Sequence, residues 1–320
     1  MKLYPLQFQP IFKERIWGGT KLKTILNKSI TSDITGESWE ISSVDNDLSI
    51  VENGFLKGKT IVEVIDQFPQ KLLGDKVYQQ FGKKFPLLFK YLDAKEDLSI
   101  QVHPNDALAL QRHNSFGKTE MWYVVQADKK AKLVVGFKNK STKEEYLQRL
   151  TDNSLLEILD LKEVKKGDAL LLNTGTVHAI GAGSLIAEIQ QTSDITYRIY
   201  DFDRVDANGN KRELHTEEAL DAINFDLVDS QKDYTKAINT SNAMVDCEYF
   251  TTNYIPLQGN HSVHRDGASF VVYMCVEGEF SIQTEEGSYE YKLGATVLIP
   301  ADLKEYTLKG NASLLEIYIS

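Results

Sequence analysis

Two histidines and a glutamate in this sequence have the residue types and the surroundings of metal ligands. His103 ends the β-rich run 98–103, Glu120 precedes the strand pattern of residues 121–125, and His178 lies in the turn-rich segment 173–181. Imidazole nitrogens and a carboxylate oxygen that meet at the inner wall of a sheet are the usual ligands of a catalytic divalent metal. A set of two histidines and one carboxylate that leaves a coordination position open favours zinc.

Polar side chains beside these residues are expected to face the same side of their strands. Because alternate residues of a strand share a face, Gln101 should point with His103, and Lys118 should point with Glu120. The pattern therefore predicts a sheet wall that carries both the ligands and an ammonium group. A single histidine in a strand is more often a core or surface residue, so the prediction depends on the ligands meeting.

The composition restricts the class of protein. The chain has 320 residues, of which 42% are hydrophobic and 26% charged, as in ordinary soluble globular proteins, and it is long enough for one large domain or two smaller ones. A net charge of −10 argues against nucleic acid or an anionic membrane as a partner. Only two cysteines occur, Cys247 and Cys275, which fits a reducing cytoplasm. The first residues lack the long apolar run of a signal peptide, and no segment approaches the length needed to cross a bilayer, so we expect a soluble intracellular protein.

The elements that must position the site are expected to be mainly strands, with two helical segments between them. Residues 60–82 have apolar side chains at helical spacing, and Pro69 should divide them into two helices. Residues 141–161 are expected to form another pair, one helix with Ser141 as its N-cap and a second helix over residues 154–161.

An internal repeat predicts the architecture. Residues 164–173 resemble residues 291–300, since each segment has a turn glycine (Gly167 or Gly294), a buried strand and a stop. A further pair of strands precedes each copy, and in the second copy we expect this pair to turn at residues 277–279. Two copies of a short-stranded antiparallel sandwich are therefore expected.

The spacing of the first copy resembles a known fold family. Gly167, Asn173, Gly175 and His178 are spaced as in the second motif of the cupin barrels, with Asn173 where proline is more usual. Residues 101–136 resemble the first cupin motif with an insert. The resemblance implies a mainly β fold of two cupin-like jelly-roll barrels with a helical insertion.

The second copy is degenerate. It keeps Gly294 and Pro300 but has neither the following glycine nor the histidine, so we expect it to bind no metal and to have a structural or lid role. The expected division is a catalytic, metal-binding domain over residues 1–235, with the helical segments near 60–82 and 141–161, and a degenerate domain over residues 236–320.

Further motifs point to one particular family within the cupin fold. Six segments together are similar to the short bacterial form of type I mannose-6-phosphate isomerase: residues 15–19, 36–42, 101–106, 117–123, 175–181 and 190–204. They extend over essentially the whole chain. The resemblance implies a zinc-dependent interconversion of mannose 6-phosphate and fructose 6-phosphate, by proton transfer through a cis-enediol intermediate. It also implies one zinc ion per chain and a small-molecule sugar phosphate as the partner.

The family's ligands carry over to three positions of this sequence. The resemblance implies that His103, Glu120 and His178 bind the zinc ion, and Gln101 matches a further ligand of the longer family members. A divalent cation near O1 and O2 of the open sugar would stabilise the negative charge that develops when a proton leaves the carbon beside the carbonyl.

Further roles follow from the same resemblance. Arg198 matches the family's catalytic arginine, and a permanently charged guanidinium suits charge stabilisation better than proton abstraction. Lys118 is a candidate for proton transfer or for contact with substrate oxygens. Lys90 is assigned to the substrate phosphate, with help from Arg198 or Arg204. Asp194, four residues before Arg198, is expected to orient it and is counted with Lys90 among the residues that bind the substrate or its phosphate.

Two other functions use the same ligands. A cupin oxygenase would hold Fe(II) with two imidazoles and a carboxylate, but it has no evident need for the cationic side chains of Lys90, Lys118 and Arg198. A sugar-binding or regulatory cupin would have no turnover, and the intact ligand set argues against it. Metal content, dependence on dioxygen and an assay for fructose 6-phosphate distinguish the three.

Overall fold

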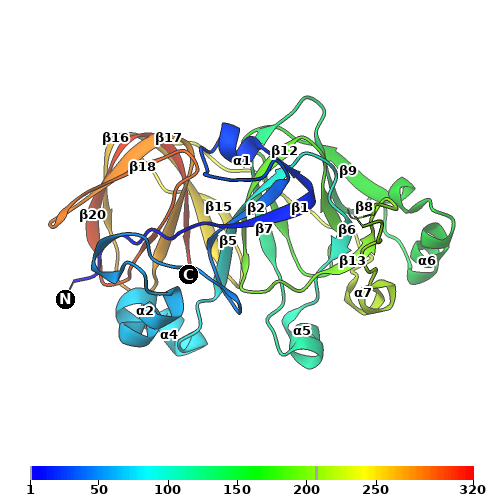
Figure 1. The fold of residues 1–320 in the computed structure, drawn as a ribbon, viewed down its shortest axis with the longest axis horizontal. Coiled ribbons are helices and arrows are strands. Elements are labelled where there is room, and N and C mark those ends of the chain that lie inside the picture. Colours follow the sequence, from blue (N-terminus) through cyan, green and yellow to red (C-terminus); the bar gives the residue numbers. More distant parts are fainter. Residues whose placement is uncertain (1, 206–207) are drawn as a thin grey trace.

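Strands make up most of the regular structure in the parts of the chain that the structure describes, residues 2–205 and 208–320. This computed structural model contains three large sheets, in which neighbouring strands pair antiparallel (Figure 1). The prediction of a mainly β protein is confirmed.

Two of the sheets come from the first three quarters of the chain. The larger has seven strands, which are, in spatial order, β1 (Ile11–Gly19), β2 (Thr35–Ile41), β5 (Leu87–Ala94), β12 (Ser184–Gln191), β7 (Glu120–Ala127), β10 (Ala169–Leu172) and β14 (Gln231–Lys232). The smaller has five, which are β13 (Tyr197–Tyr200), β6 (Ile100–Val102), β11 (His178–Ile180), β8 (Lys132–Phe137) and β9 (Leu159–Glu163). A small separate hairpin consists of β3 (Ser43–Val44) and β4 (Asp47–Leu48).

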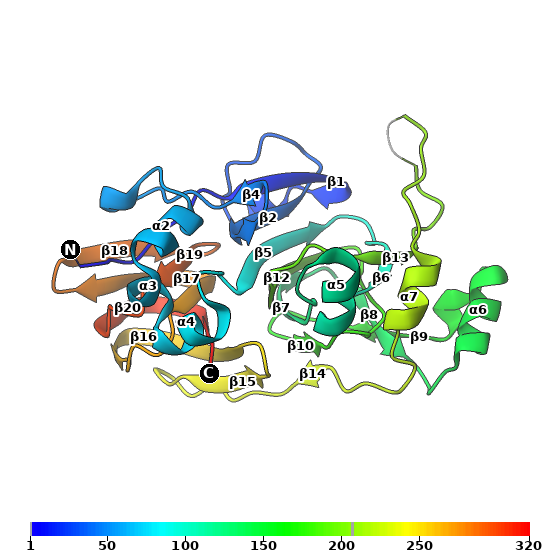
Figure 2. The same ribbon diagram turned by 90° about the horizontal axis from the view of Figure 1, so that it is seen from below.

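The third large sheet is formed by the C-terminal part of the chain. Its strands are β15 (Asn242–Asp246), β16 (Thr251–His264), β20 (Glu305–Tyr318), β17 (Val271–Thr284) and β18 (Gly287–Lys292), with β19 (Thr296–Ile299) also paired to β17. Figure 2 shows the C-terminal strands at one end of the molecule and α6 and α7 at the other, with the two N-terminal sheets between them. The strand order of each large sheet is open at both ends in the described residues, so the two predicted barrels are not confirmed as closed structures.

Alternate residues of the central strand β7 belong to two different cores. Trp122 and Val124 pack in a core that also contains Leu133 and Ile180 of the five-stranded sheet. Tyr123 belongs instead to the core that the seven-stranded sheet shares with the C-terminal sheet. This period of two is the geometry of a strand buried on both faces. Polar residues in phase with Trp122 therefore point into the space between the two N-terminal sheets.

The predicted repeat is present in the backbone hydrogen bonds. The N–H of Gly167 donates to the carbonyl of Val124, and the N–H of Gly294 donates to the carbonyl of Cys275, both at 2.9 Å. In return, the N–H of Val124 donates to the carbonyl of Asp168, and the N–H of Cys275 donates to the carbonyl of Ala295, again both at 2.9 Å. The two glycines have φ of +90° and +87°, which only glycine adopts readily. The strands that follow, β10 and β19, pair with β7 and β17 respectively.

The expected turn at residues 277–279 is wrong. Strand β17 continues through Gly278 with a shift of register, and its hairpin turn lies at residues 285–286. Gly278 has a φ of +73°, and a Cβ there would lie 2.1 Å from the carbonyl oxygen of Asn311 on β20. The glycine therefore permits close approach of two strands rather than a reversal of the chain.

The first helical segment contains three helices where two were predicted. They are α2 (Ile61–Gln67), α3 (Pro69–Leu73) and α4 (Asp75–Phe81). Thr60 and Glu63 form a capping box at the start of α2, and Pro69 is the first residue of α3, where its missing N–H costs nothing. The additional break is at Gly74, whose φ of +90° ends α3.

The second helical segment differs more from the prediction. Helix α6 (Lys143–Thr151) is present, but its N-cap is Thr142, which accepts from the N–H of Glu145, rather than Ser141. The predicted helix over residues 154–161 is wrong. Only one 3-10 turn (Leu155–Glu157) forms there, and β9 follows because it pairs with β8, an interaction that local spacing does not show.

The remaining helices are short. They are α1 (Lys21–Thr24), α5 (Asp106–His113) and α7 (Thr216–Ala222), and a further 3-10 turn covers Gly54–Leu56. Among the described residues, no helix combines the length and the apolar character that crossing a membrane requires.

Candidate metal centre and substrate pocket

Strand register brings the three predicted ligands together between the two N-terminal sheets. Gln101 on β6 lies opposite His178 on β11 and opposite Arg198 on β13. His103 follows the end of β6, and Glu120 is the first residue of β7 in the facing sheet. Positions separated by up to 75 residues along the chain are therefore placed at one point, as the alternation of the strands predicted.

The ligand atoms of the three residues converge. The Nε2 atoms of His103 and His178 are 3.2 Å apart, and the carboxylate oxygens of Glu120 lie 3.4 Å and 3.3 Å from them. All three side chains are buried, and one ligand atom from each lies within 4.8 Å of the others. This spacing fits three ligands of one metal ion.

Backbone groups orient both imidazole rings. His103 Nδ1 lies 2.9 Å from the carbonyl oxygen of Ile195, and His178 Nδ1 lies 2.8 Å from that of Thr176. Since a carbonyl only accepts, each Nδ1 must carry the proton, and each Nε2 then presents a lone pair to the cluster. A second hydrogen bond of this kind is usual for histidines that bind metals.

The carboxylate of Glu120 is the strongest sign that the cluster is built for a cation. Glu120 is fully buried, and neither of its oxygens has a hydrogen-bond partner in the described residues. Burial raises the pKa of Glu120, but the charge of Lys118 and the interactions with the two histidines outweigh this, so its pKa lies well below the usual value. An ionised, buried carboxylate whose oxygens accept no hydrogen bond is costly unless cations lie beside it. Lys118 supplies one such charge at 3.2 Å from Oε2, and the two oxygens also face the Nε2 atoms of the two imidazoles. The residues therefore fit a bound divalent metal.

The two imidazoles remain neutral in this environment. Burial lowers the pKa of His103 to about 3, and the nearby Lys118 ammonium adds to this effect. Burial also lowers the pKa of His178. Neutral imidazole is the form that binds metals.

Lys118 and Gln101 flank the cluster, as predicted from the shared strand faces. Lys118 Nζ is 3.2 Å from Glu120 Oε2 and 3.1 Å from His103 Nε2. Burial lowers the pKa of Lys118, but Glu120 and Glu188 outweigh this and raise it overall. Gln101 Nε2 lies 3.3 Å from His178 Nε2.

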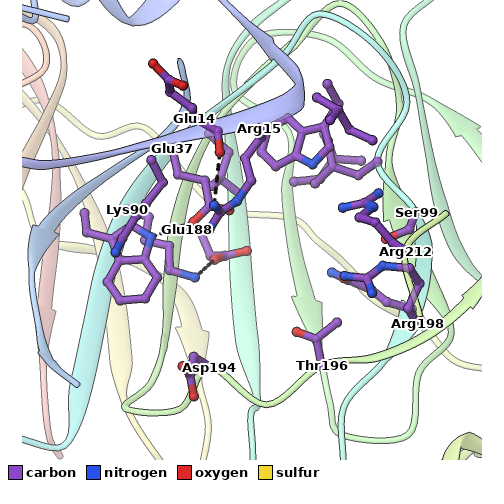
Figure 3. Close-up of a pocket in the computed structure, with 18 of the residues that line it drawn as sticks. Glu14, Arg15, Glu37, Lys90, Ser99, Glu188, Asp194, Thr196, Arg198 and Arg212 are labelled. Carbon is purple, nitrogen blue, oxygen red and sulfur yellow. Dashed lines mark hydrogen bonds and ion pairs between the residues drawn. The ribbon is translucent and has the colours of Figure 1, made fainter. Parts of the chain in front are cut away.

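A cavity of about 600 Å³ adjoins the cluster and is lined by Gln101 and Lys118. The predicted residues Lys90, Asp194 and Arg198 also line it (Figure 3). Five polar side chains that were singled out from the sequence therefore line one cavity. Trp17 and Trp39 form part of its wall as well.

Most of the cations in the cavity wall are paired with carboxylates. The pairs are Lys13–Asp47, Arg15–Glu37, Lys90–Glu188, Lys118–Glu120 and Arg212–Asp201. Arg198 is different, because in residues 2–205 and 208–320 it has no carboxylate within ion-pair distance. Its Nη1 donates to the carbonyl of Glu213 at 2.9 Å, and its buried Nε has no hydrogen-bond partner among the described residues. Burial and the neighbouring Arg212 lower the pKa of Arg198, which nevertheless stays protonated.

The guanidinium groups give one end of the cavity an excess of positive charge. Arg204 and Arg212 share a single carboxylate, Asp201, and Arg198 lies beside Arg212 with Ser99 close by (Figure 3). Burial raises the pKa of Asp201, but the two arginines outweigh it and lower the pKa. Three cations around one anion make this end suited to an anionic group.

The contacts of Asp194 and Arg204 differ from those that the sequence predicted. Among the described residues, Asp194 makes no ion pair with Arg198, although both line the cavity. Arg204 does not line the cavity and instead holds Asp201 and the carbonyl of Asp97.

Glu188 and Arg212 are charged residues of the cavity to which the sequence analysis gave no role. Glu188 pairs with Lys90 and accepts from the indole N–H of Trp122 at 2.9 Å, and Arg212 binds Asp201. The alternation of β12, in phase with Trp122 on β7, was a signal for Glu188. Arg212 had no such signal, because its partner lies in a loop eleven residues away.

Comparison with known proteins gives a consistent result. Residues 5–146 match the family described as "Phosphomannose isomerase type I, catalytic domain", and residues 239–319 match "Mannose-6-phosphate isomerase, cupin domain". The chain is 39% identical to mannose-6-phosphate isomerase ManA of Bacillus subtilis, over 98% of this chain and 99% of the relative. It is 34% identical to mannose-6-phosphate isomerase of Streptococcus mutans, over 97% of each chain.

Solved structures show the same similarity. The crystal structure of mannose 6-phosphate isomerase from Bacillus subtilis superimposes with a TM-score of 0.91 at 35% identity, and the match covers 98% of this chain and 99% of the other. A putative mannosephosphate isomerase from Archaeoglobus fulgidus has a TM-score of 0.81 at 23% identity, which shows a common fold.

Proposed function

The chain belongs to the type I mannose-6-phosphate isomerase family, and on this premise we propose that it interconverts mannose 6-phosphate and fructose 6-phosphate with a bound zinc ion. The observation that carries the proposal is the convergence of two neutral imidazoles and an ionised carboxylate beside a cavity lined by cations. The intact ligand set and the family favour this reaction over the oxygenase and the binding protein considered above.

His103, Glu120 and His178 would hold the zinc ion. Gln101 would serve as a further ligand, because rotating its amide by half a turn presents the oxygen in place of Nε2 to the same point. When bound, a divalent zinc ion supplies Lewis acidity, which stabilises negative charge on the substrate oxygens at C1 and C2.

The residues of the chain would carry the proton transfer through a cis-enediol intermediate. We assign proton transfer to Lys118, since its ammonium group lies between the ligand cluster and the cavity. Arg198 would stabilise charge on the intermediate, because its guanidinium has no carboxylate partner among the described residues and lies on the strand next to Gln101. Preorganised donors of this kind contribute roughly 10²–10³-fold to a rate.

The phosphate would bind at the end of the cavity where positive charge is in excess. Arg198 and Arg212 supply that charge. Lys90, which Glu188 already neutralises, would contact the bound sugar phosphate from the other side of the cavity (Figure 3). Asp194 would contact a substrate hydroxyl, since it lines the cavity without binding Arg198.

We also propose two cupin-like jelly-roll domains, one over residues 1–235 and a degenerate one over residues 236–320. The facing N-terminal sheets, the repeated glycine turn and the family match at residues 239–319 support this division. A cytoplasmic location is proposed because both cysteines are free.

A coupled assay tests the proposal. Mannose 6-phosphate is supplied, and fructose 6-phosphate is measured with the protein as purified, after treatment with a chelator, and after zinc is restored. We expect activity that the chelator removes and zinc restores. Absence of fructose 6-phosphate from zinc-loaded protein would overturn the proposed reaction, and activity that survives complete metal removal would overturn the role of zinc.

A further inference from the structure

A tyrosine from the C-terminal part of the chain reaches the N-terminal part next to the metal ligands. Tyr249 lies between β15 and β16, and its hydroxyl donates to Asp106 Oδ2 at 2.8 Å. Asp106 is the first residue of α5, three positions after His103. The contact joins residues 143 positions apart, so it depends on the packing of the two parts against each other.

The other oxygen of Asp106 holds the loop that leads into β7. Oδ1 accepts from the N–H of Gly117 at 2.7 Å and from Gln191 Nε2 at 3.0 Å. The amide oxygen of Gln191 in turn accepts from the N–H of Thr119 at 2.8 Å. Hydrogen bonds that start at the Asp106 carboxylate therefore fix the backbone at residues 117 and 119, on both sides of residue 118.

That intervening residue is Lys118, whose ammonium group contacts both His103 and Glu120. Its own backbone N–H makes only a long hydrogen bond, 3.3 Å, to the carbonyl of Pro104. The loop is also closely packed on α5, since a Cβ on Gly117 would lie 2.7 Å from the backbone nitrogen of Asp106. The position of the lysine thus depends on where Asp106 is held.

We propose that Tyr249 is a positioning residue for Lys118. Its hydroxyl fixes the Asp106 carboxylate, Asp106 fixes the loop at residues 117–119, and the loop aims the ammonium group at the ligand cluster. The C-terminal part, which carries no corresponding metal ligands, would in this way act on the reaction centre. The inference rests on the proposed function, because that is where Lys118 is assigned to proton transfer.

The chain offers a matched control. Tyr234 is also half-buried, and its hydroxyl donates to the carbonyl of Gly167 at 2.6 Å. Gly167 lies just before the start of β10. Leu172, the residue that pairs with Glu120, lies at the other end of that strand. Tyr234→Phe therefore removes a comparable hydrogen bond without touching the loop that carries Lys118.

The experiment compares Tyr249→Phe with Tyr234→Phe in the full-length, zinc-loaded protein. Measurements are kcat and KM for mannose 6-phosphate, zinc content, the urea midpoint, and amide hydrogen exchange of residues 117–120. For Tyr249→Phe we expect kcat to fall about fivefold, the factor for one lost hydrogen bond, with KM and zinc content unchanged. Exchange at residues 117–120 should become faster only in this variant.

The alternatives give different results. Equal kcat values for the two variants, or a loss of activity that follows a loss of zinc, would overturn the proposal. So would unchanged exchange at residues 117–120. If the unmodified protein does not convert mannose 6-phosphate, the proposed function fails by itself, and the exchange comparison still decides whether Tyr249 holds the loop.

Discussion

The imidazoles of His103 and His178 face each other with their Nε2 atoms 3.2 Å apart, while both Nδ1 atoms are bound to backbone carbonyls. Two nitrogen lone pairs are therefore held toward one point, where they would repel each other unless a cation lay between them. Glu120 adds a buried negative charge at the same point. The geometry is set by the carbonyls of Ile195 and Thr176, which makes these backbone groups part of the candidate site.

Removal of one imidazole should remove the metal. In His178→Ala we expect the zinc content and the isomerase activity to fall together, because two ligands hold zinc far more weakly than three. Metal analysis of the purified protein and the coupled assay measure both. His264→Ala is the control, since its side chain is 74% exposed and, in the part of the chain that the structure describes, pairs only with Glu305. Full zinc content in His178→Ala would show that this residue is not a ligand.

Arg198 should affect the rate but not the metal. We expect Arg198→Met to lower kcat by roughly 10²–10³-fold with zinc content unchanged, since the guanidinium would stabilise charge that develops during the reaction. Arg198→Lys should recover only part of the rate, because an ammonium lacks the planar fork. Arg149→Met on α6 serves as the control. A kcat near that of the unmodified protein in Arg198→Met would contradict the assignment.

The phosphate end of the cavity can be located by comparing two cations. Arg212→Met should raise KM for mannose 6-phosphate about tenfold or more with a small effect on kcat, because it removes charge that binds ground state and transition state alike. Lys90→Met should have a smaller effect, since Glu188 already neutralises Lys90. Inhibition by inorganic phosphate provides a second measurement. If KM is unchanged in both variants, the phosphate binds elsewhere.

Protonation of Glu37 at acid pH should lower the stability of the protein. Burial raises the pKa of this carboxyl, but Lys90, Arg15 and the indole N–H of Trp39 outweigh it, so its pKa is lowered from the ordinary 4.5. A group with a depressed folded pKa stabilises the protein above its unfolded pKa, and this contribution is lost as the pH falls through the folded value. The free energy of unfolding should therefore drop below about pH 4.5.

Urea unfolding at pH 6 and at pH 3.5–4 measures this loss. The Glu37→Gln variant should be less stable at pH 6, and its stability should fall less on acidification than that of the unmodified protein. Equal pH dependence in the two proteins would contradict the role of Glu37.

The two equivalent glycine turns should differ in their tolerance of a side chain. Gly167→Ala and Gly294→Ala both place a Cβ on backbone with φ near +90°, which should cost about 1 kcal/mol of unfolding free energy in each. At Gly294 the added Cβ would also lie 2.8 Å from the carbonyl oxygen of Leu26, whereas at Gly167 the nearest atom is 3.5 Å away. Urea unfolding should show the larger loss for Gly294→Ala, and an equal or smaller loss in this variant would contradict the effect assigned to the contact with Leu26.

Local pattern was sufficient to single out the three residues of the candidate metal site and the strands that carry them. His103, Glu120 and His178 were identified because their residue types and their positions on or beside strands are visible within short segments. The same alternation of residues placed Lys118 beside Glu120, and the repeat predicted two equivalent turns. These features depend on periods of two residues and on the conformational freedom of glycine, which the sequence expresses directly.

What the tertiary structure decided involves contacts between distant segments. Residues 154–161 carry a helical pattern, yet the segment forms a 3-10 turn and then enters strand β9, because β8 offers an unpaired edge. Arg212 enters the cavity wall because Asp201 holds it there, and Tyr249 meets Asp106 only after the two parts of the chain pack together. Such pairings form only in the assembled fold, so they cannot be predicted from the residues of a short segment. The sequence by itself therefore determined which residues could bind the metal, and only the folded chain determined which other residues surround and orient them.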